Sequence, residues 1–157
     1  MINKLNEVDL DIKRCETVLI ENDYLEVVIA IEELHDKYKN TIEGVSKINS
    51  NVVWNYSKKD VEYIKNALVN YKEKLIFEEN QKTIEEKIED IKDYIENKNV
   101  LERDKLIEVI NNIENINSEE LDLDIKWDKL KNCLELIKNQ EREIGTKILE
   151  IIVLISK

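Results

Sequence analysis

The sequence contains no proline and only two glycines, Gly44 and Gly145, in 157 residues. Folds built from many short strands need both residue types in their turns. Helices need neither, and both residues destabilise a helix interior. Hydrophobic residues make up 42% of the chain, which is more than a disordered acidic chain contains. We therefore predict an all-α fold.

Apolar residues recur at spacings of three and four near the N-terminus, as they do on one face of a helix. The first series is Leu5, Val8, Ile12, Cys15 and Leu19. Asp23 is the expected N-cap of a second helix, and Gly44 is expected directly after the end of that helix. We predict a helical hairpin over residues 1–44.

The rest of the chain is predicted to be a linker, 45–56, followed by a longer helical core, 57–157. Ser57 and Asp60 form an S-x-x-D capping signal at its start. Two apolar series follow, and they are out of register with each other. The first series is Val61, Ile64, Leu68, Tyr71 and Leu75, and the second is Ile84, Ile88, Ile91 and Ile95. The slip leaves two alternatives for 57–97, one kinked helix or two helices, and the absence of Gly and Pro favours one.

Apolar and charged residues alternate in Leu121–Trp127, as they do in a strand. We interpret this segment as an extended connection that leads into a helix. From Trp127 to Ile155 the apolar spacing is regular, and only Glu141 interrupts it. This pattern predicts one long C-terminal helix whose end is apolar almost all round. Such a helix has to be buried against other helices or against a second copy of the chain. The full prediction is a single domain, 1–157, folded as a bundle of five or six helices.

Few residues in the sequence suit catalysis. Cys15 and Cys133 lack the spacing of a metal or redox motif, so we expect buried, reduced thiols. His35, the one histidine, is expected to be partly exposed on an amphipathic helix. The sequence has no glycine-rich phosphate loop and no nucleophile motif. We therefore predict a non-catalytic protein without a cofactor.

The acidic residues leave an alternative to that prediction. Glu86 with Glu89 has the E-x-x-E spacing, and Glu119 with Asp122 has the E-x-x-D spacing, by which all-α nucleotide pyrophosphatases bind Mg²⁺. A chain with 35 acidic residues contains such pairs by chance. Lysines such as Lys87 are interleaved with them, as is typical of a solvated helix face. A Mg²⁺-dependent nucleotide phosphohydrolase is thus the alternative function, and a solvated face is favoured.

One segment departs from the acidic character of the chain. The formal net charge is −11, but Lys47–Leu75 carries +3, so the remaining residues carry −14. This basic segment is also rich in aromatic residues. The side chains expected in the core are Trp54, Tyr56 and Tyr71. The candidate partner-binding residues, which we expect to be exposed or to flank the core, are Lys58, Lys59, Tyr63 and Asn66.

The charge favours a protein partner with a basic surface. Direct binding of nucleic acid is not expected, because DNA and RNA repel a chain of charge −11. The chain has 21 Lys against three Arg and is rich in Asn and Ile, as is typical of A/T-rich bacterial and phage genes. A sharper hypothesis is therefore an acidic inhibitor, encoded by a phage or mobile element, of a basic nucleic-acid-handling host or defence protein.

A self-associating assembly protein is a further alternative, with a homodimer formed through the C-terminal helix. Without an apparent leader or membrane segment, we expect a cytoplasmic location.

Overall fold

The computed structural model describes residues 2–21, 23–48, 55–98 and 102–156. These residues form helices and no strand, which confirms the all-α prediction. The described part of the chain has seven helices, whereas five or six were predicted. In chain order they are α1 (Ile2–Ile20), α2 (Tyr24–Tyr38), α3 (Glu43–Ser46), α4 (Lys58–Asn97), α5 (Arg103–Ser118), α6 (Leu123–Ile137) and α7 (Arg142–Ile155).

The chain divides into two compact units, Met1–Glu79 and Asn80–Lys157. Helix α4 is one continuous helix that contributes its first part to the N-terminal unit and its last part to the C-terminal unit. This answers the question that the sequence left open for 57–97. The boundary between the units falls where the apolar pattern slips out of register. Each apolar series of α4 therefore serves the core of its own unit, and the folding of 1–157 as a single domain stays a prediction.

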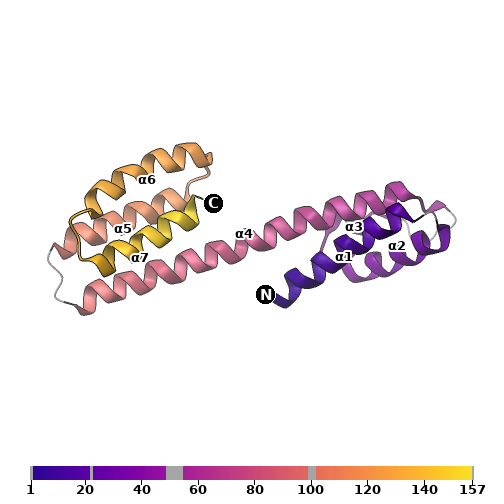
Figure 1. Ribbon diagram of the computed structural model, residues 1–157, viewed down its shortest axis with the longest axis horizontal. Helices are drawn as coiled ribbons and strands as arrows, with labels where there is room; N and C mark the ends of the chain where they lie inside the picture. The colour runs from indigo at the N-terminus through magenta and orange to yellow at the C-terminus, as the bar shows by residue number, and fades with distance from the viewer. Residues whose placement is uncertain (1, 22, 49–54, 99–101, 157) are drawn as a thin grey trace. The chain divides into compact units, whose positions relative to one another are not determined.

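The N-terminal unit packs α1, α2 and the first part of α4 side by side, with the short α3 at the end of the hairpin (Figure 1). Its core is made of the apolar faces of these helices. The buried residues are Val8, Cys15, Val18, Val27, Ala30, Ile31, Leu34, Tyr38, Val45, Tyr56, Val61, Ile64, Leu68 and Leu75. Both predicted helices of the hairpin are confirmed. His35 is buried, with 8% of its surface exposed, so the prediction of a partly exposed histidine is wrong.

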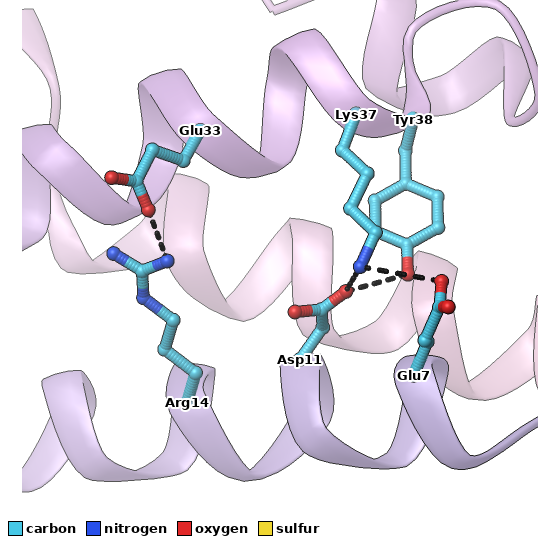
Figure 2. Close-up of polar contacts among 6 residues, drawn as sticks. All are labelled: Glu7, Asp11, Arg14, Glu33, Lys37 and Tyr38. Carbon is cyan, nitrogen blue, oxygen red and sulfur yellow. Dashed lines mark hydrogen bonds and ion pairs between the residues drawn. The ribbon is translucent and has the colours of Figure 1, made fainter. Parts of the chain in front are cut away.

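Polar contacts fix α1 against α2 (Figure 2). The Asp11 carboxylate accepts hydrogen bonds from the Lys37 ammonium and the Tyr38 hydroxyl, both at 2.6 Å. One turn further along, Arg14 forms an ion pair with Glu33. Burial raises the pKa of Tyr38, and so does its hydrogen bond to Asp11. Because these partners are specific in their spacing, they select one register of the hairpin from those that the apolar faces allow.

Two of the three predicted helix-end signals are confirmed. The Asp23 carboxylate caps α2 by accepting from the Leu25 amide at 2.9 Å. At the start of α4, the Asp60 carboxylate accepts from the Ser57 amide at 2.8 Å and from the Ser57 hydroxyl at 2.9 Å. The prediction for Gly44 is wrong. Helix α2 ends at Tyr38, before that glycine is reached, and Gly44 lies within α3.

The C-terminal unit packs the last part of α4 with α5, α6 and α7 (Figure 1). Its core is rich in isoleucine. The buried residues are Ile84, Ile88, Ile91, Ile95, Leu106, Val109, Ile110, Ile113, Ile116, Leu130, Cys133, Ile137, Ile144, Ile148, Ile151, Ile152 and Ile155. Cys15 of the other unit and Cys133 are both buried and free, as predicted.

The predicted long C-terminal helix is wrong, because the chain turns between α6 and α7 over 138–141. The next position of the apolar series is Glu141, whose carboxylate cannot be buried without a partner. The turn places that residue at the N-cap of α7 and lets both helices bury their apolar faces against α5. The extended connection before α6 is also shorter than predicted. Asp122 already occupies the N-cap, and only the four residues 119–122 separate α5 from α6.

The inner face of α7 provides a test of this packing. Ile148 is fully buried in the core, whereas Ile125 on α6 has 47% of its surface exposed. We expect Ile148→Ala to lower the free energy of unfolding by about 2–5 kcal/mol, because it removes buried methyl groups and leaves a cavity. Denaturant unfolding followed by circular dichroism measures the change.

The matched control is Ile125→Ala, which makes the same chemical change at an exposed position. We expect it to alter the free energy of unfolding by no more than about 0.5 kcal/mol. Equal effects of the two substitutions would contradict the assignment of the inner face of α7 to the core.

Candidate functional site

The residues predicted to bind a partner at the start of α4 have different surroundings in the structure. Lys58 is half-buried, and its ammonium donates a hydrogen bond to the Leu19 carbonyl at 2.9 Å. That carbonyl belongs to the last turn of α1, where a cation is favourable because the helix dipole is negative there. Lys58 therefore links α4 to the end of α1. Lys59, Tyr63 and Asn66 are exposed, as the register of the α4 apolar series predicts.

Tyr63 lies against the backbone of α3. Its hydroxyl is 2.8 Å from the position that a Cβ atom on Gly44 would occupy. A side chain at position 44 would therefore have to move the end of the exposed Tyr63 side chain. Both residues line a hollow of about 360 Å³ beside Asn55 and a second of about 520 Å³ beside Asn66 and Asn70.

The charges around these hollows are balanced. Lys47 pairs with Glu43 at 3.2 Å, and Lys74 approaches Glu78 at 3.8 Å. The Asp60 carboxylate accepts a hydrogen bond from the Ser57 amide at the start of α4. The excess positive charge of the segment 47–75 is therefore not concentrated in the hollows, whose lining includes Tyr56, Tyr63 and Tyr71 and the amides of Asn55, Asn66 and Asn70.

Two of the three aromatic side chains that were expected in the core, Tyr56 and Tyr71, belong to the part of the chain that the structure describes. Tyr56 is buried and Tyr71 is half-buried, with the Tyr71 ring edge-on to Tyr38 at a centroid distance of 6.3 Å. Trp54 lies outside the described residues. The Tyr56 hydroxyl is buried and has no hydrogen-bond partner among the described residues. Burial raises the pKa of Tyr56, and so does the negative charge of Glu32.

The carboxylates of the alternative metal site are all exposed. Glu86 lies 3.6 Å from the Lys82 ammonium, and Glu119 forms an ion pair with Lys129. Asp122 is the N-cap residue of α6. Within the described ranges, no group of three or more His, Cys, Asp or Glu side chains is arranged to hold a metal ion.

A different surface stands out at the start of α6. Residues 119–128 contain five acidic residues and one lysine. Three large apolar side chains are exposed in the same stretch, Leu123 at 53%, Ile125 at 47% and Trp127 at 38%. We call this surface the acid–apolar strip and define it by the residues Glu120, Asp122, Leu123, Asp124, Trp127 and Asp128.

The helical repeat arranges this strip. Leu123 and Trp127 are four residues apart and lie on one side of α6. Asp124 and Asp128 are also four apart and form the adjacent row. Ile125 is about 200° around the helix from Leu123, so it belongs to the other side. The strip thus presents an apolar row beside an acidic row. Leu130 is seven residues after Leu123, so the apolar row lies on the same side of α6 as the buried residues and precedes them along the helix.

Most of the negative charge of the strip is uncompensated. Glu120, Asp122 and Asp124 have no ion pair with any described residue. The one lysine of the stretch, Lys126, donates to the Asn117 carbonyl at 3.0 Å and is half-buried. Asp128 is the exception, because it pairs with the Lys131 ammonium at 2.7 Å. The same ammonium lies 5.9 Å from the centre of the Trp127 ring.

The sequence analysis missed this strip for two reasons. The alternation in Leu121–Trp127 was interpreted as an extended connection, so its side chains were not assigned to a helix face. Trp127 was assigned to the buried series of a long helix, whereas it lies at the edge of that series and is more than one-third exposed. The excess of acidic residues over lysine in 119–128 was a signal that could have revealed the surface.

No protein-family model matches the chain, and comparison with curated proteins and with solved structures found no significant match. None of the helices in the described part of the chain combines the length and the apolar content that a membrane span requires.

The two buried tyrosines of the N-terminal unit provide a matched test of their hydroxyl groups. Among the described residues the Tyr56 hydroxyl has no hydrogen-bond partner, whereas the Tyr38 hydroxyl donates to Asp11 at 2.6 Å. We expect Tyr56→Phe to raise the free energy of unfolding by about 1 kcal/mol, because it removes an unsatisfied buried group. We expect Tyr38→Phe to lower it by about 1.5–3 kcal/mol, the range for a hydrogen bond to a charged group.

Urea denaturation of the two variants and the wild type measures both changes. If Tyr56→Phe destabilises the protein as much as Tyr38→Phe does, its hydroxyl has a partner and the description of this part of the core is wrong.

Proposed function

We propose that this protein is a non-catalytic binding module that recognises a basic protein surface through the acid–apolar strip of α6. The observation that supports the proposal is the combination of an exposed leucine and tryptophan on one side of α6 with carboxylates at the start of that helix that have no ion pair with any described residue. Each part supplies what the other lacks. Apolar burial provides affinity, and the carboxylates select a partner of opposite charge.

Trp127 is the expected centre of the contact. Tryptophan is enriched among the residues whose truncation costs binding energy, because its large ring is rigid and mostly apolar. The lysine beside it, Lys131, makes a cation–π contact with the ring, and 38% of the Trp127 surface is exposed. Glu120, Asp122 and Asp124 precede it in the sequence and form the acidic rim of the strip, which increases the rate of encounter with a basic partner.

The sharper form of the proposal concerns the class of partner. Proteins that handle nucleic acid carry basic grooves, and an acidic protein that enters such a groove competes with the nucleic acid. An inhibitor encoded by a phage or mobile element, acting in the cytoplasm on a host or defence protein, fits the charge of −11. Direct contact of this chain with nucleic acid is not part of the proposal.

The candidate residues on α4 provide a second surface for a partner. Lys59, Tyr63 and Asn66 are exposed together in the N-terminal unit, but the balanced charge of the neighbouring hollows favours no particular partner. No observation on Glu86, Glu89, Glu119 and Asp122 favours the nucleotide phosphohydrolase. Self-association is the second candidate function, because α7 exposes apolar residues on its outer side.

Pull-down from bacterial lysate followed by mass spectrometry tests the proposal. We expect the wild type to capture a basic protein at low salt and to lose it as salt is raised, because screening weakens the contact. Trp127→Ala should weaken the capture about tenfold or more, which corresponds to a loss of at least about 1.4 kcal/mol. Glu120→Gln combined with Asp124→Asn tests the acidic rim without changing the apolar row.

The matched control for the charge change is Glu62→Gln with Glu73→Gln. These two carboxylates are exposed on α4 and, among the described residues, have no ion pair. The control removes the same charge from the N-terminal unit, so it should leave the capture nearly unchanged. Equal loss in both double variants would show that net charge, and not the acid–apolar strip, accounts for recognition.

A further inference from the structure

Helix α7 has a second face that the core does not use. Its inner face buries Ile144, Ile148, Ile151, Ile152 and Ile155. On the outer side, Leu149 and Val153 are 46% and 48% exposed. A hollow of about 440 Å³ lies along this side, and its lining residues are Lys87, Thr146, Leu149, Glu150, Val153 and Leu154.

The outer residues follow a regular spacing. From Arg142 the steps are four, three, four and three, which is the repeat that keeps residues on one side of a helix that pairs with another. The residues of this outer stripe are Arg142, Thr146, Leu149, Val153 and Ser156. Its two apolar residues are in the middle and its small hydroxyl residues are at either side of them. The stripe is therefore nearly symmetric about a point between Leu149 and Val153.

We propose that the outer stripe of α7 binds the outer stripe of a second copy of this chain, with the two helices antiparallel about a two-fold axis. A two-fold interface requires a surface that complements itself. Antiparallel pairing places Leu149 opposite the partner's Val153 and Thr146 opposite the partner's Ser156. It also brings Arg142 near the end of the partner's α7, where the helix dipole favours a cation.

A parallel arrangement of the same two helices is less favourable. It would place Arg142 opposite its own copy, and like charges at close range repel each other. It would also align the two helix dipoles, whereas antiparallel helices oppose them.

The charge of α7 favours a second copy over the basic partner proposed for α6. Residues 80–157 carry a net charge of −6, whereas the four charged residues of α7, Arg142, Glu143, Lys147 and Glu150, sum to zero. Lys87 pairs with Glu150 at 2.7 Å beside the hollow. This face therefore lacks the acidic excess that would repel its own copy or attract a basic protein.

Salt distinguishes this contact from the one proposed for α6. Two chains of charge −11 repel each other at long range, and salt screens that repulsion. Self-association should therefore strengthen with added salt, whereas binding of a basic partner should weaken. Two 14-residue helices form a small interface, so we expect a dissociation constant no tighter than about 1 μM.

Sedimentation equilibrium over a range of protein and salt concentrations tests the proposal. We expect a monomer–dimer equilibrium that shifts toward the dimer at high salt. Leu149→Glu should abolish the dimer and leave the circular dichroism spectrum unchanged, because the residue is exposed. Leu136→Glu is the control, since Leu136 is 59% exposed on α6 and should leave the equilibrium unchanged. A monomer at every concentration and salt, or a dimer that survives Leu149→Glu, would overturn the proposal.

Disulfide trapping tests the orientation of the helices. The native thiols should not interfere, because burial raises the pKa of Cys15 to about 11 and also raises the pKa of Cys133. We expect a mixture of Leu149→Cys and Val153→Cys proteins to form a mixed disulfide dimer faster than either protein alone. Faster formation of dimers within each single variant would indicate the parallel arrangement and overturn the proposal.

Discussion

The burial of apolar series against one another is the constraint on which the rest of this structure depends. Helix α4 carries two such series, and the change of register between them coincides with the boundary between the units. The first, from Val61 to Leu75, packs with α1 and α2, and the second, from Ile84 to Ile95, packs with α5, α6 and α7. Polar contacts, such as the hydrogen bond from Tyr38 to Asp11, then select the register of α1 against α2 in the N-terminal unit.

Function follows from what these cores leave uncovered. The apolar row of α6 continues past the residues that pack in the core, so Leu123 and Trp127 are exposed. Beside them, the carboxylates of Glu120, Asp122 and Asp124 have no ion pair with any described residue. Helix α7 is apolar on two sides, of which the core covers one. The two uncovered surfaces differ in charge, which leads to different proposed partners: a basic protein for α6 and a second copy for α7.

The sequence predicted the parts of this fold that local patterns determine. Helical spacing identified the hairpin and the faces of α4, and side-chain chemistry identified the caps at Asp23 and at Ser57 with Asp60. The turn between α6 and α7 was missed because neither Gly nor Pro marks it, and Glu141 alone interrupts the apolar series. The acid–apolar strip was missed because periodicity shows which side of a helix is apolar but not where the neighbouring helices stop covering it. For the same reason, the exposure of Tyr63 could be predicted from its register, whereas its contact with Gly44 could not.

The central claim is that α6 recognises a basic protein through the acid–apolar strip. The most direct test is an NMR titration of the isotope-labelled protein with the partner recovered by pull-down. The account predicts that the amide and indole signals of 120–128 shift and saturate together, while those of Gly44 and Tyr63 remain unchanged. Shifts that cluster around Gly44 and Tyr63, with no change in 120–128, would contradict it and place recognition on the N-terminal unit.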